Sequence, residues 1–252
     1  VLGIGLSKIK NSAMLKVAEE FNQIVLMIVT NVLIPLVPIY IGCVFAKLSY
    51  SGEIFNTLKS FGIVYVLLFA LQLTYICIQY CIAGAIKKQN PFKLIKNMVP
   101  AYMTAVGTQS SAATIPVTLQ CVKKNDVNEE VLDFVVPLGA TIHLAGDTIT
   151  LVLTSMAVMY MNGQTPTFGM IMPFIFMLGV TMVAAPGVPG GGVMAALGLL
   201  ESMLGFGAIE KPIMIALHAA QDSFGTATNV TGDGAIAILV DYIINKKKGN
   251  SI

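Results

Sequence analysis

Long apolar runs alternate with short polar links along this chain of 252 residues. The first two runs, residues 22–45 and 61–86, are long enough to cross a bilayer as helices. Lipid allows only helices and closed barrels to span it, because every backbone polar group must be satisfied internally. The pattern therefore predicts spanning helices, joined by a polar link and followed by the basic loop KKQNPFKLIK.

Two later segments have apolar arms with a break in the middle. The break is TQSSAATIP (108–116) in residues 95–122, and AAPGVPGGG (184–192) in residues 168–205. Serine, glycine and proline interrupt a helix, so each segment predicts two half-length helices that meet at a tip. We expect both segments to be re-entrant hairpins, which return to the side from which they start.

Two further expected helices have polar centres. Residues 131–161 are interrupted at GATIHLAGD, which predicts a spanning helix with an unwound centre, and residues 212–244 contain QDSFGTATNVTGD (221–233). Interrupted segments in corresponding positions are typical of secondary transporters with a site near the bilayer midplane. We expect an all-α polytopic membrane protein with about four spanning helices and two re-entrant helical hairpins, and no enzyme or channel motif competes with this interpretation.

Composition supports a membrane protein and excludes some partners. The chain is 56% hydrophobic and 11% charged, against roughly 25% charged in soluble domains. The net charge of +2 is too small to suggest nucleic acid. All fifteen basic residues are lysine, so no arginine is available for bidentate capture of a carboxylate. The four cysteines match no metal-site spacing and are expected to fill the core: Cys43, Cys77, Cys81 and Cys121.

Lysine placement predicts the topology by the positive-inside rule. If both hairpins return to their starting side, one side holds twelve lysines and the other holds Lys47, Lys59 and Lys211. We expect the side with twelve lysines to be the cytoplasm and the membrane to be a prokaryotic cell membrane. The chain opens VLGIGLSKIK without an initiator methionine or a signal peptide, so we also expect N-terminal helices to be missing.

The last expected helix carries four polar residues on one face. Asp222, Thr226, Asn229 and Asp233 are spaced 4, 3 and 4, and carboxylates in a membrane are expensive without a partner. One carboxylate, the amide and freed carbonyls near Gly232 would make an oxygen cage for a monovalent cation, while the other carboxylate would take a substrate ammonium. The alternative is a polar helix contact or a water-lined gap.

Other polar positions leave several alternatives open. The hydroxyls and amides at Ser110-Ser111 suit an anion, and the glycine tip 187–192 suits close backbone approach and a hinge. The alternative interpretation of each tip is an ordinary turn that binds no ligand. His143 and Asp147 are spaced i, i+4, so they could pair as a cation or proton site or as a structural hydrogen bond. We expect His218 to be a packing histidine with its hydrogen bonds satisfied.

TQSSAATIP, PLGATIHLAGD, GVPGGG and DSFGTATNVTGD, in this order, resemble the dicarboxylate/amino acid:cation symporters. These are the glutamate-transporter homologues, which include bacterial serine/threonine transporters, and the resemblance runs from about residue 15 to 245. It implies the C-terminal portion of an elevator fold that is a homotrimer when full length. Residues 1–50 would end the scaffold region, and residues 51–252 would form the transport domain.

The resemblance also implies ligands. Asp222 would bind the substrate amino group, with Thr226 at that end, and Val188 would offer a tip carbonyl. Asn229 and Ser110-Ser111 would hold the α-carboxylate. The implied coupling ion is Na⁺, with no other cofactor. Two sets of ligands are expected for this ion. The first set consists of Asn229 and Asp233 with carbonyls near Gly139 and His143. The second set consists of carbonyls near Thr141 and Leu144 with the end of the second hairpin.

Departures from the family pattern bear on the substrate. Gly225 stands where members with acidic substrates have an arginine, and Gln109 where some prokaryotic members have one. The family's NMDGT reads HLAGD here, so Asp147 takes a place that faces the substrate side chain. Asp147 could restore a cation site, take a proton, bond a substrate hydroxyl or accept a cationic side chain. The first hypothesis is therefore Na⁺-coupled symport of a small neutral amino acid, serine or threonine.

Three alternatives remain. The same fold could carry an acidic amino acid or dicarboxylate, or couple to protons through His143 and Asp147. It could also be a substrate-gated ion conductor, or this truncated chain could be inactive. Substitution of Asp222 by asparagine should impair transport of a substrate with an amino group, whereas transport of a dicarboxylate without one should be indifferent to it.

Overall fold

The computed structural model describes residues 13–28 and 54–249, with isolated positions between them. The chain divides into two compact units, Val1–Gly52 and Glu53–Ile252. Helix α2 (Ala13–Ile28) belongs to the first unit. Most of the predicted spanning helix at 22–45 lies outside the described residues. The roles of scaffold and transport domain stay predictions.

The second unit consists of helices, and no strand occurs among the residues described there. Three helices are long and apolar enough to cross a membrane, over Phe61–Lys87, Glu129–Met161 and Glu210–Lys246. They correspond to three of the four predicted spans. The helices of this unit, in chain order, are α4 (Ile54–Lys87), α5 (Pro91–Thr108), α6 (Ser111–Lys123), α7 (Glu129–Ile142), α8 (Ala145–Met161), α9 (Phe168–Met182), α10 (Gly191–Leu204) and α11 (Glu210–Gly249).

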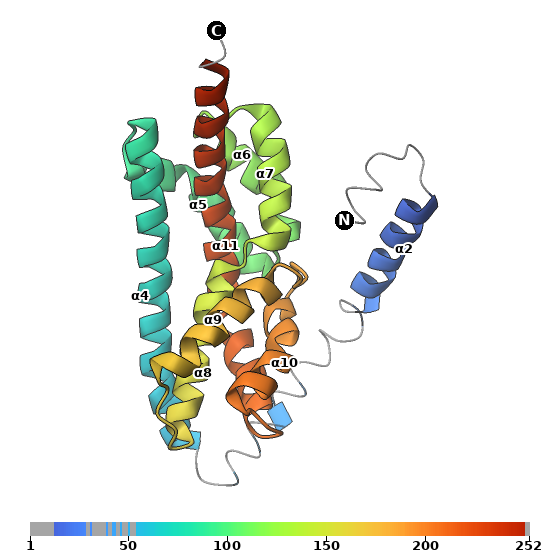
Figure 1. Cartoon of the computed structure of the whole chain (residues 1–252), viewed down its shortest axis with the longest axis vertical. Coiled ribbons are helices and arrows are strands. Elements are labelled where there is room, and N and C mark those ends of the chain that lie inside the picture. Colours follow the sequence, from blue (N-terminus) through green and yellow to red (C-terminus); the bar gives the residue numbers. More distant parts are fainter. Residues whose placement is uncertain are drawn as a thin grey trace. The chain divides into compact units, whose positions relative to one another are not determined.

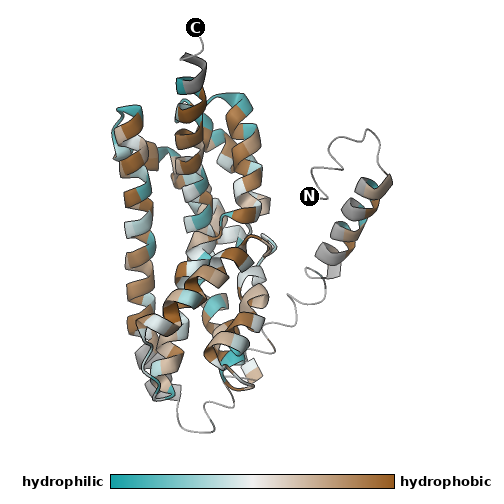
Figure 2. Ribbon diagram, viewed as in Figure 1, coloured by the Kyte–Doolittle hydropathy of each residue, from teal (hydrophilic) through white to brown (hydrophobic). Residues whose placement is uncertain are grey.

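Large apolar side chains cover much of the outside of this unit, as a lipid-facing surface requires. Hydrophobic residues run along most of α4, and hydrophilic residues gather at the turn that follows it (Figure 2). Val66, Phe134 and Phe176 are each more than three-fifths exposed. This exterior and the three long apolar helices confirm a multi-pass membrane protein.

Each predicted hairpin is a pair of helices. The first pair, α5 and α6, meets at Gln109, which has a left-handed backbone (φ 52°), and Ser110 caps α6 by accepting from the amide of Ala113. The second pair, α9 and α10, meets at a non-helical tip that ends at Gly190, where φ is +74°. Glycine adopts this conformation without strain. The paired helices are as predicted, whereas their re-entrance into the membrane stays a prediction.

The predicted broken helix is confirmed, with α7 ending at Ile142 and α8 starting at Ala145. Helix α11, in contrast, is continuous through the polar stretch. The prediction of freed carbonyls near Gly232 is therefore wrong, because the helical hydrogen bonds continue there. Helix α11 contacts α4, α5, α6, α7, α8 and α10 and forms the centre of the unit (Figure 1).

Lysine-bearing segments collect at one end of this unit. The α4–α5 turn, the α6–α7 loop and the C-terminal end of α11 lie at the same end, opposite the α8–α9 and α10–α11 connections (Figure 1). By sequence, the first three segments carry Lys87, Lys88, Lys123, Lys124 and Lys246, whereas the α10–α11 connection leads to Lys211. This arrangement agrees with the predicted grouping of the lysines.

Candidate functional site

The polar face of α11 is buried in the unit. Asp222, Thr226, Asn229 and Asp233 are each at most 5% exposed. Buried carboxylates need hydrogen-bond donors or opposite charge nearby. Helices α7, α8 and α10, which converge on this face, supply them.

Asp222 faces the tip of the second hairpin. The backbone N–H of Gly190 donates to Oδ2 of Asp222 at 2.7 Å, and Oγ1 of Thr226 lies 3.3 Å from Oδ1. Both oxygens of the carboxylate therefore have a partner. The Gly190 contact joins the tip directly to the residue that is expected to bind the substrate amino group.

Asp147, near the start of α8, lies between two partners from α11. Nε2 of His218 is 2.8 Å from Oδ1 of Asp147, and the side-chain amide of Asn229 donates to Oδ2. Asp147, His218 and Asp222 each offer one ligand atom within 4.8 Å of the others, and all three are buried. His218 is thus a buried histidine with a hydrogen-bond partner, as expected, and it is also part of a polar cluster.

Asp233 has the other histidine as its partner. Nδ1 of His143 lies 2.9 Å from Oδ1 of Asp233, and Nε2 lies 3.2 Å from the hydroxyl of Tyr75. The amide of Gln79 donates to the same hydroxyl at 2.8 Å. The suggested pairing of His143 with Asp147 is wrong, because the helix is interrupted between them and their i, i+4 spacing no longer places them on one face.

Two glycines bring α8 and α11 into close contact. A Cβ atom on Gly146 would lie 2.2 Å from the carbonyl oxygen of Gly225. This proximity lets the amide of Gly146 donate to Oδ1 of Asn229 at 2.7 Å. The crossing therefore requires a glycine at 146, and it fixes the orientation of the Asn229 side chain.

The two hairpin tips touch each other. Oγ of Ser110 donates to the carbonyl of Gly187 at 2.9 Å while it also caps α6. The strained Gln109 is held by a 2.9 Å bond from its amide to Oγ of Ser223 on α11. A Cβ on Gly187 would lie 2.7 Å from the carbonyl oxygen of Ala140, so this tip packs against the end of α7.

A cavity of about 10 Å³ lies where these elements meet. Such a space holds about one water molecule, so an amino acid enters only if the tips separate. Six of the eight residues expected to bind substrate line the cavity, and Ser110 and Gly225 do not. The lining residues are Gln109, Ser111, Leu144, Asp147, Pro186, Gly187, Val188, Gly192, Asp222, Thr226 and Asn229.

Sequence reasoning missed the two histidine partnerships. His218 stands four residues before Asp222 on the same helix, and that spacing is the signal that could have included it. Tyr75 and Gln79 come from α4, 68 and 64 residues before His143 in the chain, and nothing local links them. Gly192 was expected only as part of a flexible tip, yet a Cβ there would lie 2.8 Å from Oδ1 of Asp147.

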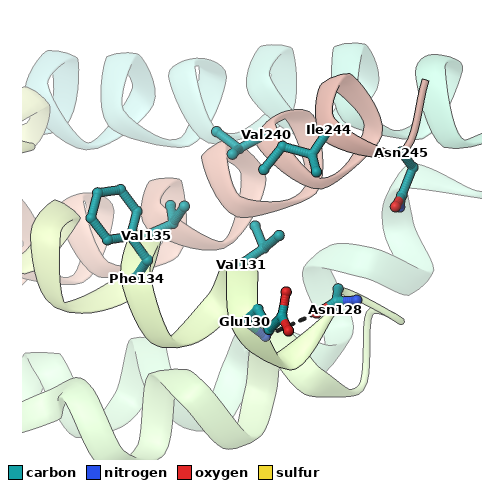
Figure 3. A pocket seen from close by; sticks show the side chains of 8 residues that line it. All are labelled: Asn128, Glu130, Val131, Phe134, Val135, Val240, Ile244 and Asn245. Carbon is teal, nitrogen blue, oxygen red and sulfur yellow. Dashed lines mark hydrogen bonds between the residues drawn. The ribbon is translucent and has the colours of Figure 1, made fainter. Parts of the chain in front are cut away.

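A larger cavity of about 250 Å³ lies elsewhere, between the start of α7 and the end of α11 (Figure 3). Val131, Phe134, Val135, Val240 and Ile244 make most of its wall, and its polar residues stand at one end. It lacks the converging polar groups of a specific site. The small cavity at the hairpin tips is therefore the candidate site.

The predicted sodium ligands differ in how well they suit the ion. Oδ1 of Asp233 and Oδ1 of Asn229 already face protein donors, as described above, and the carbonyl of Gly139 accepts from the amide of His143 at 2.8 Å. Three oxygens of this first set therefore already accept one hydrogen bond each from the protein, and the set stays a prediction.

The second predicted set is partly available. The carbonyl of Leu144 accepts from both N and Oγ1 of Thr148, so its two lone pairs are in use. Thr141 lies in the last turn of α7, where helical carbonyls lack an intrahelical partner. The end of α7, beside the second hairpin, therefore remains suited to a cation.

Comparison with known proteins agrees with this geometry. Residues 1–243 match the sodium:dicarboxylate symporter family. The chain is 31% identical over 160 residues to the excitatory amino acid transporter 1 of Ambystoma tigrinum, which covers 63% of this chain and 29% of that relative. It is 29% identical over 165 residues to the human neutral amino acid transporter A, over 64% of this chain and 31% of that relative. The aligned part of the chain thus spans under a third of these relatives' length.

Proposed function

Because this chain belongs to the sodium:dicarboxylate symporter family, whose members are transporters rather than enzymes, we propose that it forms the substrate-binding part of a Na⁺-coupled amino acid symporter. Its substrate is a small neutral amino acid such as serine or threonine. The protein acts in a prokaryotic cell membrane, as a homotrimer when full length. Residues 51–252 move as a transport domain against the scaffold, with both hairpins re-entrant.

The observation that carries this proposal is the set of groups around the small cavity. Asp222 is placed to take an α-amino group, as soon as Gly190 releases it. Ser111, the first residue of α6, lines the same cavity, and a helix N-terminus suits an α-carboxylate. Ser110 helps by capping α6 and joining the tips, and Thr226, Asn229 and Val188 complete the wall.

The charge of the cavity disfavours an acidic side chain. The chain has no arginine, and the basic group beside the cavity, His218, is bonded to Asp147. An aspartate or glutamate side chain would therefore meet the Asp147 carboxylate and find no free cation. A substrate hydroxyl can instead donate to a carboxylate, and an unmatched charge is rejected more strongly than a missing methylene.

Sodium coupling is part of the proposal through the end of α7. The carbonyl of Thr141 and the backbone at the end of the second hairpin would hold the ion. A cation between these elements binds only when the tip is closed, so it would link ion binding to the closure of the gate.

The experiment that tests this function is uptake into proteoliposomes that contain the full-length gene product. Labelled serine, threonine and aspartate are compared under a Na⁺ gradient and, separately, under a proton gradient. An Asp222→Asn variant serves as the matched control, since it keeps the shape and removes the charge. We expect Na⁺-driven serine or threonine uptake that the variant loses.

Other outcomes assign the function differently. Aspartate uptake would overturn the selectivity argument, because it would mean that an acidic side chain is held without arginine. Uptake of a dicarboxylate that is indifferent to Asp222→Asn would point to a substrate without an amino group. Uptake driven by protons alone would overturn Na⁺ coupling.

A further inference from the structure

We propose that the imidazole of His143 keeps sodium away from Asp233, so that this carboxylate is not a cation ligand in this protein. The inference deepens the proposed function, on which it rests, by removing one of the two expected ion sites. It starts from a contrast between the two histidines of the chain. His218 bonds Asp147, which lines the small cavity, whereas His143 bonds Asp233, which does not.

The hydrogen bond between His143 and Asp233 occupies Oδ1, one of the two carboxylate oxygens. An ionised carboxylate only accepts, so the 2.9 Å contact requires a proton on Nδ1. Both the imidazolium and one neutral tautomer carry that proton. The hydrogen bond to Asp233 therefore forms whether the ring is neutral or charged.

Contacts on the far side hold the ring in place. Nε2 of His143 lies 3.2 Å from the hydroxyl of Tyr75, which is bonded in turn to Gln79. A Cβ on Gly232 would lie 2.4 Å from Cε1 of the ring. The ring is thus packed against the backbone of α11 and anchored to α4, and it cannot swing away without breaking these contacts.

Two further oxygens of the expected site, the Asn229 amide oxygen and the Gly139 carbonyl, also accept hydrogen bonds. The amide oxygen of Asn229 accepts from Gly146, and a Cβ on Gly139 would lie 2.4 Å from Oδ1 of Asp233. The backbone of α7 therefore packs against one side of the carboxylate, and the imidazole ring of His143 contacts it from another side. An ion that used Oδ1 of Asp233 and the amide oxygen of Asn229 would have to expel the imidazole and to turn the Asn229 amide.

The first test is an Asp233→Asn variant of the full-length protein. Its thermal stability in detergent is measured over a series of NaCl concentrations, with choline chloride holding the ionic strength constant. Asparagine still accepts from Nδ1 of His143, so the fold is retained. We expect the half-saturating Na⁺ concentration to change by less than about threefold, because stabilisation by an ion reports only sites that bind it.

The second test is His143→Asn, which removes the ring and provides an amide oxygen. Tyr75→Phe is the matched control, because it breaks the same chain of bonds and leaves the ring over Asp233. We expect additional Na⁺-dependent stabilisation in His143→Asn and none in Tyr75→Phe. That gain should disappear in the double variant with Asp233→Asn.

Two results would overturn the proposal. The first is a rise of about tenfold or more in the half-saturating Na⁺ concentration of Asp233→Asn. The second is a folded His143→Asn variant without any gain. If His143→Asn does not fold, the half-saturating Na⁺ concentration of Asp233→Asn still tests the proposal. Because stability needs no transport, a protein that fails the uptake test still reports whether Asp233 binds Na⁺.

Discussion

At the scale of single residues, two histidines serve three of the buried carboxylates. His143 bonds Asp233, while His218 bonds Asp147 and lies beside Asp222. The sequence raised the problem of buried acids without a lysine or arginine nearby, and ligands alone were the expected answer. The two histidines already supply part of the hydrogen bonding that these buried carboxylates need. Asp222 differs from the other two, because its hydrogen-bond partners are a hydroxyl and one backbone amide and not a histidine.

Substitution of His218 tests the cost of leaving Asp147 without its partner. Both side chains are at most 5% exposed, and breaking a buried pair costs about 3–5 kcal/mol. We expect His218→Leu to lower the apparent melting temperature in detergent clearly. His218→Gln, which keeps a donor, should recover much of the loss. Equal stability of wild type and His218→Leu would contradict the pairing.

Substitution of Asp222 tests its role in holding an amino group. We expect Asp222→Asn to lower kcat/KM for uptake by about tenfold to a hundredfold, since a charged hydrogen bond contributes about 1.5–3 kcal/mol. Asp241→Asn is the control, because Asp241 is equally buried on α11 but accepts from the backbone of Asn128. Similar losses in the two variants would indicate a general effect of neutralising buried acids.

At the scale of elements, the breaks in helices position the site. The tips of α5–α6 and α9–α10 and the interruption between α7 and α8 meet on the polar face of α11. Glycine, proline and serine clusters predicted each break, because these residues punctuate helices by local chemistry. Local chemistry could not predict which carboxylate each histidine bonds, because the paired residues lie 71 and 90 positions apart in the chain. Continuity of α11 through Gly232 was also missed, because glycine weakens a helix without ending one that is packed on all sides.

The crossing of α8 and α11 gives a matched pair of glycine variants. A Cβ on Gly146 meets the Gly225 backbone at 2.2 Å, whereas a Cβ on Gly225 has its nearest contact at 3.6 Å. We expect Gly146→Ala to destabilise the protein by about 1–3 kcal/mol, as overpacking does, and Gly225→Ala to leave it nearly unchanged. Melting temperatures of the two purified variants compare them directly. A reversed order would mean that the helices are not in this register.

At the scale of the whole molecule, the lysine-rich ends predict an orientation in the membrane. Single cysteines at Lys124 and Lys211, in a background without native cysteines, would be probed with a membrane-impermeant thiol reagent. We expect the reagent to reach position 124 from the cytoplasmic side and position 211 from outside. Labelling of both positions from one side would contradict an odd number of crossings between them.

The hydrogen bond from Gly190 occupies Oδ2 of Asp222, the carboxylate that we propose as the ligand of the substrate amino group. If a substrate ammonium takes this oxygen, it must displace the tip amide, and the measured affinity would then be the difference between the two interactions. In that case the tip amide would act as a tethered competitive inhibitor that is always present at high local concentration. Weak apparent affinity would then reflect the strength of this inhibitor as much as the quality of the substrate's own contacts, and an unloaded site would close by itself.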